Sequence, residues 1–579
     1  MQRLVASQSV LFVPAPWHRW YDPGVPFTFA YPDWTLPDLL RRSVTRFPQH
    51  TALIFYGARL SFRELDVLTT RFAFALRALG VRPGDRVALM LPNVPQAVIG
   101  YYGALKAGAI VVQINPMYVS REIEAQLADS GSETILVLDR LYPRVAAVKD
   151  RTPLKRILVT SIRDFLPLGK RLWYDVKARL DGHRVHIETQ HQVFDFLTLV
   201  KAAPDEGPVP LPVPRPDDLA LLQYTGGTTG VAKGVMLSHR NVVANALQGR
   251  YWVPDFREGY EVFLGVVPFF HVYGLSTCQH IAMMTGSAVI LLPRFQTVEV
   301  LRTIHRYRVT ILSGIPAMFM AINEFPGLDR YDLRSLRVCL SGAGPLHADV
   351  RNRFERATGV KIAEGYGLTE AGPVTHCNPI YGDRPDESIG LPFPDTEVRI
   401  VDEETGERDL PVGETGELLV RGPQVMSGYW NNRADTDAVL RNGWLYTGDL
   451  VRQDERGFFH LMDRKKDMIK SRGENVYPRE VEEILLKHPA IRDAVVVGVP
   501  DPQLGEAIKA YIVLREGCRL SKGELLQHCR PWLARFKVPT AVEFRQELPR
   551  SAVGKALRRL LREEETRKAR AESEVCTVG

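Results

Sequence analysis

The sequence contains few cysteines and no long uninterrupted apolar run. The six cysteines are scattered over 579 residues, without a C-x-x-C pair or a cluster spaced to ligate a metal. We therefore expect free thiols in a reducing compartment, which excludes a disulfide framework and a zinc site. The first residues also lack the sustained apolar segment of a secretory signal, and Pro14 and Pro16 follow them closely. These features predict a cytoplasmic protein.

One segment has no charged residue at all. Between positions 262 and 293 the chain contains no Asp, Glu, Lys or Arg, and such a lack of charge is also typical of membrane-spanning segments. However, Pro268, His271, Gly274, Gln279 and Gly286 interrupt it, and a spanning helix needs roughly 20 predominantly apolar residues. We expect a buried strand, a loop that lines a site and a second buried element.

The overall composition is that of an ordinary globular protein, with 45% hydrophobic and 24% charged residues. The length predicts at least two folded units, and the sequence has no internal repeat. Basic residues exceed acidic ones by 74 − 67 = 7. This modest excess suits anionic small molecules, nucleic acid or a membrane surface, and does not choose among them.

Apolar patterning in the first part of the chain predicts alternating helices and strands. The capping box Ser61–Glu64 opens a helix that stops at Gly80. Buried strands are expected at 87–91, 110–114 and 134–138, with helices at 97–106 and 120–128 between them. Strands separated by helices at this spacing are typical of mostly parallel sheets.

The pattern changes twice later in the chain. Short strands and glycine turns from 397 to 459 predict a β-rich subdomain. After Asp463, a helix opened by Pro478, strands near 494–498 and 508–513, and helices near 521–533 and 555–565 predict a compact α+β unit. The predicted fold class is therefore α/β, with a large domain over 1–463 and a small domain over 464–579 that meet near 463–466.

The most informative loop is Tyr224-Thr-Gly-Gly-Thr-Thr-Gly-Val-Ala-Lys-Gly234, which follows a strand-like run. Its glycines allow backbone N–H groups to approach phosphate oxygens, its threonines add hydroxyl donors, and Lys233 adds a positive charge. The loop is not a Walker A motif, because Gly follows Lys233 where Ser or Thr would be needed. On its own, it fits phosphate binding and a mobile glycine turn about equally well.

Seven ordered blocks give the chain a family resemblance. After the loop come Pro268–Gly274, Ser341–Pro345, Gly365–Glu370, Tyr446–Asp449, Asp463–Lys470 and Pro549–Lys555. In this order they resemble the adenylate-forming enzymes, which include acyl-CoA synthetases, the adenylation domains of peptide synthetases and firefly-type luciferases. The Gly-Gly-Thr-Thr-Gly loop and the block Glu364–Glu370 are most similar to bacterial long-chain fatty-acid–CoA ligases.

The resemblance implies ATP, coenzyme A and a fatty acid as substrates, Mg²⁺ as cofactor, and no nucleic acid as partner. A carboxylate attacks the α-phosphorus of ATP, so charge must be neutralised on both sides of the reacting centre. Glu370, with Thr225, is similar to the family's magnesium ligands, and Asp449 to the residue that binds both ribose hydroxyls. The implied nucleotide-binding residues are Thr225, Gly226, Gly227, Thr228, Thr229, Gly230, Lys233, Gly342, Ala343, Gly344, Gly365, Tyr366, Gly367, Leu368, Thr369, Asp449 and Arg464.

The resemblance also implies catalytic roles for three residues. Lys555, at the expected start of a helix, is similar to the lysine that bridges the incoming carboxylate and the α-phosphate. His271 matches a position that lines the acyl pocket, where it would serve as a neutral hydrogen-bonding group. Lys470 is implied in thioester formation. That second step would follow rotation of a mobile small domain about Lys466.

The implied function is activation of a long-chain fatty acid to acyl-AMP, followed by thioester formation with coenzyme A. Ligation of a medium-chain or aryl acid, or formation of fatty-acyl-AMP alone, are alternatives from the same chemistry. A catalytically silent nucleotide- or acyl-binding regulator is an alternative from another class. A peptide-synthetase module is not expected, because few residues remain after Lys555 for a carrier domain.

A basic amphipathic pattern lies at 164–180. Phe165, Leu168, Leu172, Val176 and Leu180 recur at three- or four-residue spacing, beside four basic residues: Lys170, Arg171, Lys177 and Arg179. Packing onto the large domain or a dimer partner is the favoured reading. Peripheral contact with the inner face of a membrane is the alternative. Homodimerisation is implied by the resemblance alone.

Overall fold

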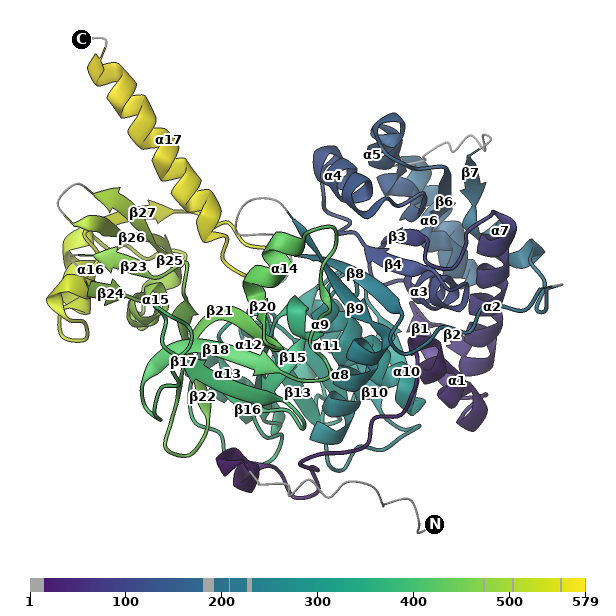
Figure 1. Cartoon of the computed structure of the whole chain (residues 1–579), viewed down its shortest axis with the longest axis horizontal. Helices are drawn as coiled ribbons and strands as arrows, with labels where there is room; N and C mark the ends of the chain where they lie inside the picture. The colour runs from purple at the N-terminus through teal and green to yellow at the C-terminus, as the bar shows by residue number, and fades with distance from the viewer. Residues whose placement is uncertain are drawn as a thin grey trace.

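The computed structural model describes residues 15–180, 192–207, 209–225, 232–471, 474–501, 504–551 and 554–577. In these residues the strands form three sheets of fourteen, eight and five strands (Figure 1). The first two sheets belong to the large unit, and the third lies after residue 464 with the last helices of the chain. The α/β fold class is confirmed.

The largest sheet joins a parallel part to an antiparallel part. Strands β1, β11, β10, β12, β13 and β14 pair in parallel, and the strands from β15 to β17 continue the sheet with antiparallel pairs. In spatial order the strands are β17 (Glu397–Val401), β18 (Thr415–Arg421), β21 (Trp444–Gln453), β22 (Phe459–Arg464), β16 (Ser388–Pro392), β15 (Val374–Cys377), β14 (Ile362–Gly367), β13 (Val338–Ser341), β12 (Ile311–Gly314), β10 (Val262–Gly265), β11 (Ala288–Leu291), β1 (Thr51–Phe55) and β2 (Ala58–Ser61), with β20 (Leu440–Arg441) beside β21. The β-rich segment is thus an extension of this sheet.

The second sheet contains the strands expected from the first part of the sequence. Its order is β19 (Gly428–Tyr429), β9 (Lys233–Ser238), β8 (Leu219–Thr225), β4 (Ile110–Gln113), β3 (Arg86–Met90), β5 (Thr134–Leu138), β6 (Arg156–Thr160) and β7 (Val193–Asp195). The six strands from β8 to β7 are parallel. The expected capping box is present, since Ser61 Oγ accepts a hydrogen bond from Glu64 N and the Glu64 carboxylate accepts one from Ser61 N.

Helices connect and flank these strands. In the large unit they are α1 (Leu36–Arg46), α2 (Phe62–Ala78), α3 (Pro95–Lys106), α4 (Ser120–Ser130), α5 (Tyr142–Ala146), α6 (Leu168–Leu180), α7 (Phe196–Ala202), α8 (His239–Trp252), α9 (Val272–Gly274), α10 (Ile281–Thr285), α11 (Thr297–Tyr307), α12 (Pro316–Asn323), α13 (Ala348–Thr358) and α14 (Arg433–Val439). The charge-free segment comprises β10, the helical stretch α9–η5–α10, in which η5 (Leu275–His280) is a π-helical turn, and β11. As expected, most of it is buried. In the described residues no helix is both long and apolar enough to cross a bilayer.

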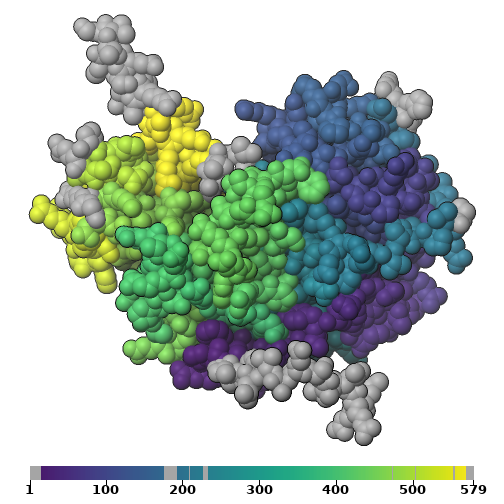
Figure 2. All heavy atoms as spheres, in the orientation of Figure 1, coloured from purple at the N-terminus to yellow at the C-terminus, as the bar shows by residue number. Residues whose placement is uncertain are grey.

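The third sheet and the last helices form the small unit at one end of the molecule, as Figures 1 and 2 show. Its sheet has the order β24 (Glu474–Val476), β23 (Ile469–Ser471), β26 (Gly505–Leu514) and β25 (Ile491–Asp501), with β27 (Ala541–Arg545) beside β26. Its helices are α15 (Pro478–Leu486), α16 (Lys522–Cys529) and α17 (Arg558–Thr577). The domain boundary between 463 and 464 stays a prediction.

One local expectation is wrong. The last helix begins at Arg558, so Lys555 lies three residues before it, in a turn that Gly554 N closes by donating to Ser551 O at 2.8 Å. Of the stripe at 164–180, Leu168, Leu172 and Val176 are exposed, so these three residues do not pack onto the described part of the large unit. Packing onto a dimer partner and contact with a membrane stay predictions.

Candidate active site

A cavity of about 1800 Å³ lies between the two units. Parallel strands β8, β12, β13 and β14 deliver residues to it from their carboxyl ends, where open α/β sheets usually bind ligands. From the large unit its lining includes Thr225, Lys233, Gly342, Ala343, Gly344, Gly365, Tyr366, Gly367, Leu368, Thr369, Glu370 and Asp449. From the junction and the small unit it includes Arg464, Lys466 and Lys555.

Most of the predicted site residues are therefore brought together, with clear exceptions. Gly226, Gly227, Thr228, Thr229 and Gly230 lie outside the described residues. Lys470 is described but does not line the cavity: it is exposed on β23, and its backbone N donates to Glu506 at 2.8 Å.

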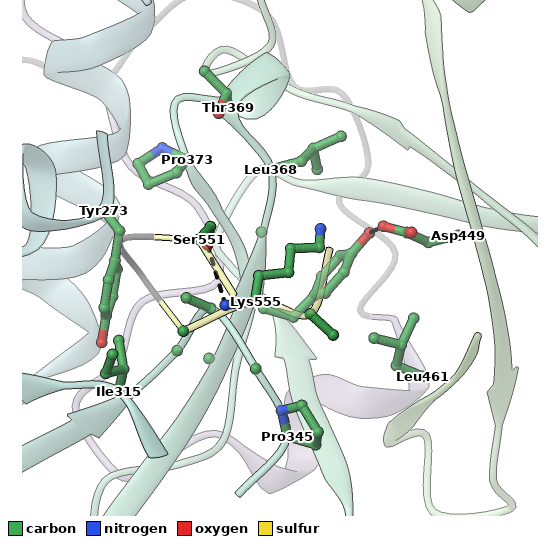
Figure 3. Close-up of a pocket in the computed structure, with 18 of the residues that line it drawn as sticks. Tyr273, Ile315, Pro345, Leu368, Thr369, Pro373, Asp449, Leu461, Ser551 and Lys555 are labelled. Atoms are coloured by element: carbon green, nitrogen blue, oxygen red, sulfur yellow. Dashed lines mark hydrogen bonds between the residues drawn. The ribbon is translucent and has the colours of Figure 1, made fainter. Parts of the chain in front are cut away.

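Lys555 reaches the cavity from the small unit (Figure 3). Its backbone N donates to Ser551 Oγ at 3.1 Å, and the Gly554 carbonyl accepts from Arg550, which also pairs with Asp493. Gly554 has a φ of 77°, and a Cβ there would lie 3.3 Å from Ile315 of the large unit. Glycine is required because this turn is both left-handed and pressed against the neighbouring unit.

The ammonium group of Lys555 stands in an open cavity that protein surrounds. Desolvation by this surrounding protein, and then the positive charges of Arg464 and Lys466, lower the pKa of Lys555 to about 7, although the negative charge of Asp449 opposes this shift. The pKa of Lys466 is lowered to about 8, first by desolvation and then by Arg464. The site thus holds three cations close together, an arrangement that a polyanionic ligand stabilises.

Asp449 is buried on β21 and makes two strong side-chain contacts. It accepts a hydrogen bond from Tyr366 Oη at 2.6 Å and pairs with Arg464 of the adjacent strand at 3.1 Å. The hydrogen bond between Asp449 N and Thr447 Oγ1 also holds the turn at Gly448. These contacts fix the carboxylate before a ligand arrives. Asp449 and Arg464 are direct partners here.

Two loops approach the cavity through small residues. At Gly342, a Cβ would lie 3.0 Å from the ring of Tyr273, whose hydroxyl donates to the Gly314 carbonyl at 3.0 Å. At Gly367, a Cβ would collide with the backbone of Pro373. Ala343 adopts a left-handed φ of 66°, which is uncommon for a residue other than glycine. Glycine at 342 and 367 is therefore required by packing against neighbouring protein atoms at the wall of the cavity.

Glu370 and Thr225 line the same cavity, and Glu370 Oε1 accepts from Tyr429 Oη at 2.9 Å. The described residues contain no group of three or more His, Cys, Asp and Glu side chains that could cage a metal ion. One carboxylate and one hydroxyl suit Mg²⁺, which keeps waters and takes phosphate oxygens as further ligands. Lys233 lies near by, paired with Asp435 at 2.7 Å and placed over the ring of Tyr429.

His271 lies at the start of α9, where its Nδ1 accepts a hydrogen bond from Tyr273 N at 3.3 Å. Burial, and to a smaller extent the positive charge of Lys555, lower its pKa to about 4. The ring is therefore neutral at pH 7, and with Nδ1 as acceptor its proton is on Nε2. This neutral state agrees with the predicted role of His271 as a hydrogen-bonding group and disagrees with a role as a cation.

The part of the cavity lining contributed by α8 and its neighbours is mostly apolar, and we call this part of the cavity the apolar arm. The expected segments 262–293 and 310–320 both contribute, through residues such as Tyr273, Ile281, Ile315 and Met320. Sequence reasoning missed the contribution of α8, which supplies Asn245, Gly249 and Trp252. The available signal was Gly249, because a glycine inside a helix usually has a packing reason. A Cβ at this position would lie 3.0 Å from Ile281 Cδ1, so α8 and α10 pack closely at this point of the lining.

Another, partly buried lining residue was also missed. Glu364 on β14 accepts a hydrogen bond from Leu346 N at 3.2 Å, and burial raises its pKa to about 7. Its place directly before the Gly365–Glu370 block gave no sign of this burial.

Comparisons with known proteins identify relatives over both units. The AMP-binding enzyme family matches residues 40–430, and the AMP-binding enzyme C-terminal domain matches residues 480–555. A long-chain-fatty-acid–CoA ligase of Bacillus subtilis is 46% identical over 95% of this chain and 98% of its own length. ATP-bound MatB of Rhodopseudomonas palustris is 28% identical, with a TM-score of 0.81 over 92% of this chain and 99% of that one. The apo form of MatB gives a TM-score of 0.72 over the same shares.

The lowered pKa of Lys555 predicts proton uptake when ATP binds. Above pH 7 much of Lys555 is neutral in the free protein, and the triphosphate raises its pKa because it favours the charged form. Calorimetric titration with ATP, in buffers of different ionisation enthalpy, should show that Lys555 takes up as much as about one proton per ATP at pH 8. At pH 6 it should take up none. K555M should remove the larger part of the uptake at pH 8 and leave the share of Lys466, whose pKa is also lowered, to about 8, whereas K470M, outside the cavity, should keep all of it. Equal uptake by wild type and K555M would contradict the assignment.

The close approach of Gly249 to Ile281 predicts that the residue at position 249 determines how wide the apolar arm is. G249L should fill the arm, so that kcat/KM for palmitate falls by at least about tenfold while octanoate changes much less. G523L, at a helical glycine of the small unit with open space around it, is the matched control and should alter neither value. A parallel fall for both acids with G249L would show that the position does not select chain length.

Proposed function

Because this chain belongs to the AMP-binding enzyme family, we propose that it is an AMP-forming ligase that joins a long-chain fatty acid to coenzyme A. The observation that carries the proposal is Lys555, a cation of the small unit set beside Asp449, Arg464 and His271 in the cavity between the units. The name of the Bacillus subtilis relative supports a long-chain acid, and the apolar arm of the cavity supports an alkyl substrate.

In the first step, the fatty-acid carboxylate attacks the α-phosphorus of ATP and pyrophosphate leaves. Lys555 neutralises charge that develops between the carboxylate and the α-phosphate, and a flexible ammonium group can follow this charge as it moves. Neutral His271 donates a hydrogen bond to the carboxylate. Asp449 accepts hydrogen bonds from the ribose, and the backbone at 342–344 and 365–367 flanks the adenine.

Magnesium is part of the proposal, held by Glu370 and Thr225. When bound, it supplies positive charge to the β- and γ-phosphates. Lys233 adds a further cation on the same side of the cavity. The loop 226–230 is proposed to donate backbone N–H groups to the phosphates.

In the second step, the thiol of coenzyme A attacks the acyl carbonyl and AMP leaves. Lys555 must withdraw for the thiol to enter, which requires the small unit to turn. The contacts around the junction favour Lys466 as the pivot. Lys465 is tied to the large unit, through its N to the Gly448 carbonyl at 2.9 Å and its Nζ to Glu417 at 2.8 Å. Asp467 is tied to the small unit, through Arg562 at 3.0 Å and Arg558 at 3.5 Å.

The present arrangement corresponds to the first step. Lys555 is inside the cavity and Lys470 is outside it. The higher TM-score against the ATP-bound than against the apo form of MatB supports this reading. Rotation would exchange the two lysines, so we propose that Lys470 serves thioester formation.

The setting of the enzyme completes the proposal. We propose a cytoplasmic protein, supported by the five free cysteines of the described residues, which form no disulfide. A long-chain acid partitions into lipid, so contact with the inner face of a membrane would place the enzyme near its substrate. Homodimerisation is proposed from the similarity to bacterial ligases.

Product analysis tests the reaction itself. With palmitate, Mg-ATP and coenzyme A, the protein should form AMP, pyrophosphate and palmitoyl-CoA, and acids from acetate to oleate should define its range. Formation of ADP would indicate a kinase, and absence of nucleotide turnover a silent binder. Either result would reject the proposal.

The exchange of lysines predicts a split between the two half-reactions. K470A should keep palmitate-dependent exchange of pyrophosphate into ATP, and should slow thioester formation from palmitoyl-AMP by at least about tenfold. K522A is the control, since Lys522 is another small-unit lysine outside the cavity, with its Nζ on the Thr540 carbonyl. Equal loss of both half-reactions in K470A would contradict a role in the second step alone.

A further inference from the structure

Helix α6 presents apolar side chains to solvent. Leu168, Leu172 and Val176 are 80%, 69% and 55% exposed. They recur every four residues, so they form one stripe along the helix, which we call the α6 apolar face. Contiguous exposed apolar surface of this kind marks an interaction site, whereas single exposed apolar residues do not.

The opposite face of α6 is attached to the body of the protein by polar contacts. Lys170 donates to the Tyr56 carbonyl at 2.7 Å and lies over the Tyr56 ring. One turn later, the Tyr174 ring lies under Arg140 with 5.6 Å between the guanidinium carbon and the ring centroid. The helix therefore has the reverse of the usual orientation of an amphipathic helix: its apolar stripe faces solvent and its opposite face contacts the protein.

The charge of the helix identifies what would cover the apolar face. Its basic residues are Lys170, Arg171, Lys177 and Arg179, and Asp175 is its one acidic residue. An exposed apolar stripe on a helix with such an excess of basic over acidic residues is typical of helices that lie in the plane of an anionic membrane surface. A second copy of this chain would meet the same positive charge, so lipid is the better match.

The position of α6 allows docking without hindering catalysis. The helix lies on the part of the large unit remote from the small unit (Figure 1). It does not line the cavity, whose residues come from other elements. A membrane on this side would leave the small unit free to turn.

We propose that the α6 apolar face is a docking surface for anionic lipid bilayers. Leu168, Leu172 and Val176 would enter the boundary between headgroups and acyl chains, and the net positive charge of the helix would attract the anionic headgroups. The proposal goes beyond the ligase reaction, since it assigns a surface that the chemistry does not use.

Flotation of the full chain with vesicles tests the proposal. Wild type should float with vesicles of phosphatidylcholine and phosphatidylglycerol, and much less with phosphatidylcholine alone or at high salt. L168E/L172E/V176E should lower the partition coefficient by at least about tenfold. V176E and V412E form a matched pair, because Val176 and Val412 are 55% and 56% exposed. V176E should weaken flotation, and V412E should not.

Activity toward water-soluble octanoate and thermal unfolding should be unchanged in these variants, which separates loss of docking from loss of folding or of the ligase reaction. Three outcomes would overturn the proposal. Wild type remains at the bottom of the gradient, the triple variant floats as well as wild type, or flotation does not depend on anionic lipid. Conversion of a wild-type dimer to a monomer by the triple variant, without flotation of the wild type, would instead assign the face to a second copy.

Discussion

The structure depends on the entry of one cation into a cavity that another unit builds. The large unit supplies the carboxyl ends of its parallel strands, with Asp449 buried at one side, and the small unit supplies Lys555 on a short turn. Reaction between a carboxylate and a triphosphate brings like charges together, so a site for this chemistry must concentrate positive charge. In the free protein, desolvation and then the neighbouring positive charges lower the pKa values of Lys555 and Lys466.

The same constraint explains why the cation comes from a separate unit. A lysine fixed on the large unit would remain beside the acyl carbonyl and obstruct the thiol that must follow. The residues on either side of Lys466 are held by different units. Lys465 is bound to Glu417 of the large unit, and Asp467 is bound to Arg558 and Arg562 of the small unit. The contacts that would have to break for the small unit to turn include the hydrogen bonds from Arg479 N to Asp463 and from Asn475 to Glu403, and the ion pair between Arg515 and Glu324.

Much of this architecture could be predicted from the sequence, because the relevant signals are local. The capping box at Ser61, the buried strands of the parallel sheets and the proline that opens α15 depend on residues a few positions apart. The motif order likewise predicted which distant segments meet at the cavity, apart from the loop residues outside the described chain.

The features that the sequence did not predict depend on contacts between residues far apart in the chain. The turn that places Lys555 before α17 depends on contact between Gly554 and Ile315, more than 200 positions away. The width of the apolar arm depends on how close Gly249 comes to Ile281, and the spacing of apolar residues in the sequence does not reveal this distance. Helix α6 shows the limit most clearly, since its pattern defines an apolar stripe whether that stripe faces the core or the solvent.

The most direct test of the central claim is a comparison of the two half-reactions in a variant that lacks the inserted cation. K555A should lose palmitate-dependent release of pyrophosphate from Mg-ATP by several orders of magnitude. It should still convert preformed palmitoyl-AMP and coenzyme A to palmitoyl-CoA at close to the wild-type rate. Undiminished release of pyrophosphate by K555A would contradict the account.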